Sequence, residues 1–273
     1  MPRLTVGTWN IKDGGLSPNG DDRLWRQVEV MDAHPHVDVW AIQEAQGWAA
    51  NGRRLLHQVA ASLEMPGRYL VPSNHHGCDL VVLVRERPGL WVVQEQHDTA
   101  HPWWHALAHL ALLFEGMALH VMNVHLAPSN PQVRLAEAQC FGLFRDWNVI
   151  AMGDFNAMPA GPLPTGDIPA GDKVQRKLDQ RPAQALAEAG FHDVATVLSD
   201  PTPTVGHSKP GGLAYRCDRI VSTLPPDTYT SYQVLDGQGL SDHRAVIATF
   251  DLTNFRQPAE RMPPSPHPPP DRS

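Results

Sequence analysis

The sequence lacks any long, uninterrupted apolar segment. No run approaches the roughly 20 apolar residues that a membrane-spanning helix requires. Residues 1–9 lead straight into an apolar, β-prone segment, without the basic head, long apolar stretch and cleavage site of a secretory signal. We therefore expect a cytoplasmic protein that has no membrane partner.

Cysteine is scarce, and two common hydrolase motifs are missing. The three cysteines, Cys78, Cys140 and Cys217, are odd in number and widely spaced, which argues against the disulfide framework of a small secreted domain. We interpret them as reduced thiols that are buried as small apolar groups. The sequence also has no HExxH and no GxSxG, which disfavours zinc and serine hydrolases of those types.

Positive charge is in short supply. Lysine and arginine total 22 against 29 aspartates and glutamates, which gives a net charge of −7. Affinity for a nucleic acid backbone comes largely from lysine and arginine, so strong nonspecific attraction to a polyanion is disfavoured. This balance still leaves room for a nucleic acid substrate, because a metal ion and a local basic patch can govern the site.

The chain is long and apolar enough for one large domain. Its 273 residues are 42% hydrophobic, which suffices for a substantial core, and we expect a single domain over residues 1–253. Residues 254–273 form a Pro-rich tail that lacks the composition to build a core. We expect this tail to be disordered.

The apolar pattern alternates between strands and helices. A tight turn at Glu115-Gly116 is expected to join two strands of a meander. Residues 158–172 and 199–212, rich in proline and glycine, are expected to be irregular loops. Strand-rich halves with helices outside predict two packed sheets in an α/β sandwich. Strands are expected over 3–11, 37–43, 68–71, 80–85, 90–94, 105–115, 117–126, 148–152, 219–221 and 245–252, and helices over 24–33, 51–62, 131–144 and 182–189.

Polar residues gather near the ends of the apolar strands, in the segments TWNIK, IQE, NVHLAPS, GDFN and SDHR. Each segment alone has an ordinary structural explanation. Asp154 or Asn156 in GDFN can bond the amides of a turn, and Glu44 can cap the segment that starts at Ala45. Packing alone does not explain why so many strands end in acids and imidazoles, so the joint occurrence is the informative feature.

In this order, the segments resemble the endonuclease/exonuclease/phosphatase superfamily, from Thr5 to about Phe250. The match is closest to the DNase I pattern, because Asn10 is followed by Lys12 and His125 leads into an APS segment. CDRIV at 217–221 and SDH at 241–243 fit the same template. The resemblance implies a four-layer α/β sandwich of two packed mixed β-sheets flanked by helices, and a metal-dependent phosphoester hydrolase.

The resemblance also implies a metal shell and a histidine–carboxylate pair. Glu44 is expected to bind Mg²⁺, with Mn²⁺ as an accepted substitute, and Asn10 and Asp242 complete or orient the shell. His243 is expected to pair with Asp218, which fixes the tautomer of the imidazole and raises its basicity.

Three more residues are expected to face the reacting phosphate. Asp154 orients the attacking water, Asn156 donates to a phosphate oxygen, and His125 donates to a second oxygen or assists the leaving group. These roles suit in-line attack of an activated water on a phosphoester.

The sequence indicates the type of reaction more directly than it indicates the substrate. We expect a phosphodiesterase or endonuclease that cleaves DNA or RNA. The alternative is a phosphatase or phosphodiesterase for a small-molecule or lipid-headgroup phosphoester, and a catalytically inactive binding module is less favoured.

The sequence departs from the family pattern at several positions. Gln46 stands where DNase I has an arginine that contacts DNA. Lys12 replaces an aspartate of the exonuclease III pattern, and Cys78 and Asp79 stand nearest to the glutamate that pairs with the mid-chain histidine of DNase I. No protein partner is indicated.

One basic cluster follows the loop after GDFN. Lys173, Arg176 and Lys177 lie in the segment DKVQRK. We interpret these residues as ordinary charge on a solvated helix, with phosphate contact as the alternative.

Overall fold

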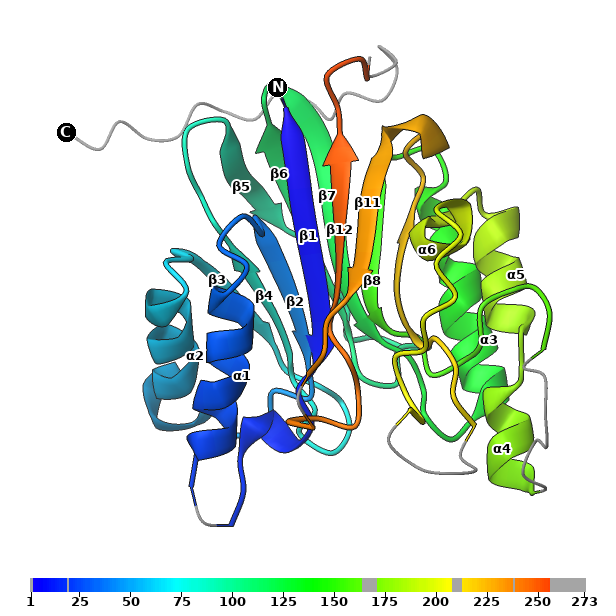
Figure 1. The fold of residues 1–273 in the computed structure, drawn as a ribbon, viewed down its shortest axis with the longest axis horizontal. Coiled ribbons are helices and arrows are strands. Elements are labelled where there is room, and N and C mark those ends of the chain that lie inside the picture. Colours follow the sequence, from blue (N-terminus) through cyan, green and yellow to red (C-terminus); the bar gives the residue numbers. More distant parts are fainter. Residues whose placement is uncertain (1, 19, 164–170, 208–212, 238, 256–273) are drawn as a thin grey trace.

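Two six-stranded β-sheets pack face to face, with helices on both outer sides (Figure 1). The computed structural model describes residues 2–18, 20–163, 171–207, 213–237 and 239–255. The strand order is β11-β12-β1-β2-β4-β3 in the first sheet and β5-β6-β7-β8-β10-β9 in the second. The strands are β1 (Arg3–Asn10), β2 (Val39–Gln43), β3 (Gly67–Val71), β4 (Leu80–Val84), β5 (Leu90–Glu95), β6 (Leu107–Phe114), β7 (Met117–His125), β8 (Val149–Asp154), β9 (His192–Asp193), β10 (Asp218–Ser222), β11 (Tyr229–Val234) and β12 (Val246–Asp251).

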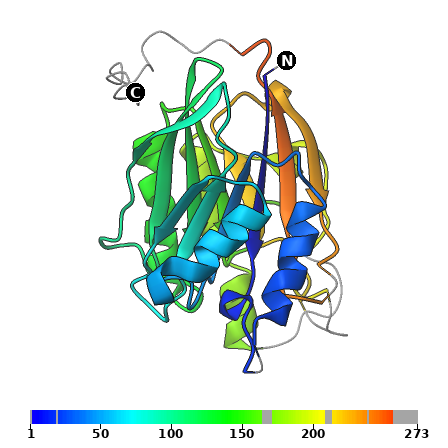
Figure 2. The ribbon, with the colours of Figure 1, turned by 90° about the vertical axis from the view of Figure 1, so that its left-hand side faces the viewer.

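The helices complete a four-layer sandwich, which confirms the predicted fold class. Figures 1 and 2 show α1 and α2 on the outer face of the first sheet, while α3 and α5 lie on the side of the second. The helices are α1 (Asp22–Asp32), α2 (Ala50–Ser62), α3 (Pro131–Cys140), α4 (Asp172–Lys177), α5 (Arg181–Glu188) and α6 (Val194–Val197), with short 3-10 turns η1 (Asp13–Gly15), η2 (Phe141–Phe144) and η3 (Pro226–Thr228).

The alternation of side chains along each strand separates the core into layers. In β2, Val39 and Ala41 face the core between the sheets, whereas Trp40 and Ile42 pack with α1 and α2. Because both faces of the strand are covered, its sequence is a continuous apolar run and not an alternating one. A third cluster joins α3 and α5 to the outer face of the second sheet.

Strand direction brings several chain segments to one end of the sandwich. β1 and β2 are parallel, as are β7 and β8, so these four strands finish at the same end. β12 is antiparallel to β1, and β10 is antiparallel to β8, so those two strands start there. Asp218 therefore begins β10, and SDHR precedes β12, although SDHR was predicted to lie near the end of a strand.

Most predicted elements are present, including the Glu115-Gly116 turn between β6 and β7. The edge strands β9 and β11 were missed, and α4 starts where an irregular loop was expected to end. The helix expected over 131–144 is α3 followed by the 3-10 turn η2. Parts of both predicted loops, 164–170 and 208–212, and residues 256–273 of the predicted tail lie outside the described residues.

The sequence predicted three reduced, buried cysteines and no membrane-spanning helix. All three cysteines are free; Cys78 and Cys217 are buried as expected, but Cys140 is only half-buried. Among the described residues, no helix has the length and apolar character needed to cross a membrane.

Candidate active site

The polar residues singled out in the sequence meet where the parallel strands end. Asn10 is the last residue of β1, Glu44 follows β2, and Asp154 is the last residue of β8. The fully buried Asn10 amide donates from Nδ2 to Glu44 Oε1 (3.0 Å) and to Asp154 Oδ2 (3.2 Å). Because Asn10 and Asp154 belong to different sheets, this amide links the two halves of the site.

Strand register aligns two further site residues with Asp154. In the second sheet, His125 of β7 lies opposite Asp154 of β8, and Asp154 lies opposite Asp218 of β10. His125 Nε2 lies 3.4 Å from Asp154 Oδ2. Neighbouring strands thus place an imidazole and two carboxylates side by side, all of them almost completely buried.

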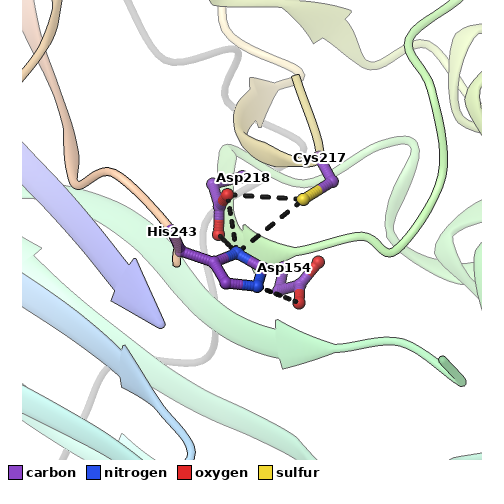
Figure 3. A group of neighbouring side chains, drawn as sticks. All are labelled: Asp154, Cys217, Asp218 and His243. Atoms are coloured by element: carbon purple, nitrogen blue, oxygen red, sulfur yellow. Dashed lines mark hydrogen bonds and ion pairs between the residues drawn. The ribbon is translucent and has the colours of Figure 1, made fainter. Parts of the chain in front are cut away.

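His243 lies between the two carboxylates, as Figure 3 shows. Its Nδ1 is 3.0 Å from both oxygens of Asp218, and its Nε2 is 3.8 Å from Asp154 Oδ2. Burial lowers the pKa of His243, but the negative charges of Asp218 and Asp154 outweigh burial and raise it to about 10. The predicted partners, His243 and Asp218, are therefore in contact.

Asp154 is the centre of the group. Burial raises its pKa, but the charged His243 ring, the neighbouring His125 and the Lys177 ammonium lower it more, so the net shift is downward and the group stays a carboxylate. Its Oδ1 accepts the Asn156 backbone N–H at 2.8 Å. Asn156 has a positive φ of 50° and donates from Nδ2 to the Leu126 carbonyl (3.0 Å), which ties the turn after β8 to the end of β7.

Asp79, one of the two residues nearest to the position of the DNase I glutamate, bonds a residue other than His125. Asp79 Oδ1 instead accepts the Ser73 N–H (3.0 Å), and Ser73 Oγ bonds His105 Nδ1 (2.8 Å). The His105 ring stacks on the His125 ring with centroids 4.2 Å apart. Burial lowers the pKa of His125, which favours the neutral ring. Within the described part of the chain, His125 Nδ1 has no hydrogen-bond partner.

Glu44 has the properties of a Mg²⁺ ligand. It is half-buried, has a positive φ of 57°, and accepts single hydrogen bonds from Asn10 Nδ2 and from the Asp13 N–H (3.2 Å). Each carboxylate oxygen therefore keeps acceptor capacity, and carboxylate and amide oxygens are the donors that Mg²⁺ prefers. Asp242 is half exposed and pairs with Lys12 Nζ at 3.5 Å.

A second group could also hold a metal by distance alone. Asp154, Cys217, Asp218 and His243 offer donor atoms within 4.8 Å of one another. However, burial raises the pKa of the Cys217 thiol, and its Sγ lies 3.4 Å from Asp218 Oδ2. A protonated thiol and an imidazole bonded to a carboxylate form a hydrogen-bonded cluster and do not suit Mg²⁺, so we favour the Glu44 side for the metal.

Sequence reasoning missed His105 and gave contact of Lys177 with phosphate only as the alternative. The stacking of His105 on His125 depends on the pairing of distant segments. Lys177, interpreted as surface charge, is half-buried and donates from Nζ to Asn156 Oδ1. Its basic neighbours in the sequence gave the only signal.

Solved structures of other proteins share the fold of this chain. The endonuclease/exonuclease/phosphatase from Bacteroides vulgatus has 13% sequence identity and a TM-score of 0.68, over 92% of this chain and 99% of that one. D. rerio TDP2 complexed with a single strand DNA product has 18% identity and a TM-score of 0.63, over 92% and 100%. An AP endonuclease from Archaeoglobus fulgidus has 16% identity and a TM-score of 0.61, over 91% and 99%. These likenesses establish the fold.

The sequence comparisons settle the family. No curated protein matches the sequence. The profile of the Endonuclease/Exonuclease/phosphatase family matches residues 7–243, a span that includes every predicted site residue. The chain therefore belongs to the Endonuclease/Exonuclease/phosphatase family, whose members hydrolyse phosphoester bonds.

Proposed function

We propose that this chain is a Mg²⁺-dependent phosphodiesterase that cleaves nucleic acid. The observation that carries the proposal is the convergence on Asp154 Oδ2, where the Asn10 amide, His125 Nε2 and His243 Nε2 lie 3.2, 3.4 and 3.8 Å away. A carboxylate ringed by donors, next to a carboxylate suited to a metal, is the arrangement that phosphoester hydrolysis needs.

Each residue has a role that follows from its contacts. Asp218 occupies His243 Nδ1, so Nε2 is the nitrogen that faces Asp154 and the reacting phosphate. Asp154 accepts a hydrogen bond from the attacking water and orients it, and His125 donates to a phosphate oxygen or to the leaving group.

The proposed metal would be held by Glu44, with Asn10 and Asp242 completing or orienting the shell. When bound, Mg²⁺, or Mn²⁺ in its place, supplies positive charge to the phosphate oxygens. Asn10 fixes the direction of the Glu44 carboxylate, because its Nδ2 bonds Oε1.

Nucleic acid is the favoured substrate. The similar structure of D. rerio TDP2 holds a single strand DNA product, which supports a comparable substrate here. A small phosphoester is the second candidate. It is favoured by the net charge of −7 and by Gln46, which replaces the DNA-contacting arginine of DNase I and donates from Nε2 to Cys78 Sγ at 3.3 Å. We keep a cytoplasmic location as a prediction.

The test is hydrolysis of supercoiled plasmid, single-stranded RNA and bis-(p-nitrophenyl) phosphate with Mg²⁺ or Mn²⁺. Glu44→Ala and His243→Ala are expected to lower kcat by ~10²- to 10⁴-fold. Glu188→Ala and His192→Ala, which alter exposed residues of the same types, serve as matched controls. Hydrolysis of the small ester alone would favour the second candidate, and a wild-type protein inactive on all three would refute the proposal.

A further inference from the structure

The structure separates the basic residues of α4. Arg176 is exposed, and its side chain donates to the carbonyls of Asp172 (3.3 Å) and Ser129 (3.4 Å). Lys177, the next residue, turns inward and donates from Nζ to Asn156 Oδ1. The two cations thus occupy different environments, and only Lys177 of this pair reaches a residue of the candidate site.

Backbone contacts fix where Lys177 stands. The N–H of Met158, two residues after Asn156, donates to the Lys177 carbonyl at 3.2 Å. The Lys177 main chain and its ammonium are therefore both tied to the turn that follows Asp154, so α4 presents this side chain to the site in one direction.

A buried arginine connects α4 to the His125 segment. Arg134 of α3 is fully buried. It donates from Nη1 to the Ala127 carbonyl (2.9 Å) and from Nη2 to the Arg176 carbonyl. Ala127 lies two residues after His125, and Arg176 immediately precedes Lys177. One guanidinium thus sets the distance between the two segments, because its planar fork has a fixed geometry.

The Lys177 ammonium reaches the neighbourhood of Asp154 through Asn156, whose backbone N–H donates to Asp154 Oδ1 at 2.8 Å and whose Oδ1 accepts from Lys177 Nζ. Asn156, which was expected to donate to phosphate, uses Nδ2 on the Leu126 carbonyl and Oδ1 on Lys177. The ammonium is therefore a strong donor next to Asn156, two residues after Asp154.

We propose that Lys177 Nζ binds a nonbridging oxygen of the substrate phosphate, and that Arg134 is the positioning residue that holds Lys177 in place. The inference rests on the proposed function, because it takes a phosphoester as the substrate. A fixed ammonium at this point complements the charge that develops on the phosphate oxygens.

The first experiment compares Lys177→Met and Lys177→Arg with Arg176→Ala as the matched control. Rates on bis-(p-nitrophenyl) phosphate give kcat and KM, and calorimetric titration with inorganic phosphate in the presence of Mg²⁺ gives a binding constant. Lys177→Met is expected to lower kcat/KM by ~10²-fold and to weaken phosphate binding, with partial recovery in Lys177→Arg. Arg176→Ala is expected to leave both unchanged.

The second experiment tests Arg134 through a double-mutant cycle. Arg134→Lys keeps the charge but loses the fork, so kcat is expected to fall in the wild-type background and to change little in the Lys177→Met background. An equal loss of kcat in both backgrounds would show that Arg134 acts only on the fold. The melting temperatures of all variants distinguish such a general loss of stability from a specific effect on Lys177.

The outcomes distinguish the two proposals. Wild-type rates and wild-type phosphate affinity in Lys177→Met would overturn the role of Lys177 while leaving the proposed function intact. If the wild-type protein hydrolyses none of the substrates, the proposed function fails, and the phosphate titration of wild type against Lys177→Met still decides whether Lys177 binds the anion.

Discussion

Asp218 controls the charge and direction of the His243 ring. Asp218→Asn keeps the shape of the side chain but removes the negative charge that pairs with the His243 ring. We expect kcat to fall by ~10²- to 10⁴-fold with little change in KM. Asp251→Asn, which alters a surface carboxylate paired with Arg3, is the control and should leave kcat unchanged.

Asp218→Asn is also expected to change how the stability of the protein depends on pH. The pKa of His243 is raised from 6.5 to about 10 in the folded state. The stabilisation that this pair contributes is therefore complete below pH 6.5 and is lost as the pH rises toward about 10. The gap in melting temperature between wild type and Asp218→Asn should narrow over that range. A gap that widens with pH would mean that the ring is neutral in the fold.

Site residues could be predicted from the sequence where they lie at the end of an apolar strand. Asn10 and Asp154 each end an apolar strand, so both could be picked out in the sequence, whereas the contact between them depends on how the two sheets pack. The position of Lys177 was not predictable, because it depends on a guanidinium from α3 that bonds a carbonyl of α4. The stack of His105 on His125 likewise requires the pairing of β6 with β7 and the side-chain directions at that site.

At the scale of elements, one loop residue bonds both segments that carry the His243–Asp218 pair, the start of β10 and the approach to β12. Thr204 is fully buried, and its Oγ1 accepts the N–H groups of Cys217 and Asp218, each at 3.1 Å. Its carbonyl accepts the N–H of Arg244, the residue after His243, at 2.9 Å. The loop therefore holds β10 and the approach to β12 at a fixed separation.

Thr204→Val removes the hydroxyl and keeps the shape of the side chain. Two buried N–H groups lose their acceptor, which costs ~1–3 kcal/mol of stability, and Asp218 is less firmly placed. We expect kcat to fall more than KM rises, and Thr204→Ser to restore both activity and melting temperature. Equal impairment in Thr204→Val and Thr204→Ser would contradict a role for the hydroxyl. Unfolding curves and steady-state rates measure both.

Elements with continuous apolar runs were predicted well, and edge elements were not. β2 and β4 are buried on both faces, and their sequences leave few alternatives. β11 lies at the edge of its sheet with three of its six residues exposed, so YTSYQV gives no apolar signal. The strand exists because β12 offers an unpaired edge, a property of the neighbouring strand and not of the segment itself.

At the scale of the whole molecule, the site exists only while the two sheets keep their relation. Asn10 and Glu44 come from the first sheet, and His125 and Asp154 come from the second. Beneath them, Asn123 of β7 reaches across the core. Its Oδ1 accepts Gln43 Nε2 at 2.6 Å, and its Nδ2 donates to the carbonyls of Ile42 and Val81, each at 2.9 Å.

Asn123→Ala would remove the acceptor that Asn123 offers to Gln43 Nε2, which keeps Thr8 Oγ1 and the Ala41 carbonyl, and the donor that it offers to the Ile42 and Val81 carbonyls. We expect the free energy of unfolding to fall by ~2–4 kcal/mol, and kcat to fall as well, because the Asn10–Asp154 contact loses its support. Asn148→Ala is the matched control: Asn148 is also buried and donates to the Ala118 carbonyl, but it precedes β8 at the end away from the site. It should lose stability and keep kcat. If Asn123→Ala also kept kcat at a temperature where it is fully folded, the packing of the apolar core alone would set the sheet geometry, and the polar bridge would contribute only stability.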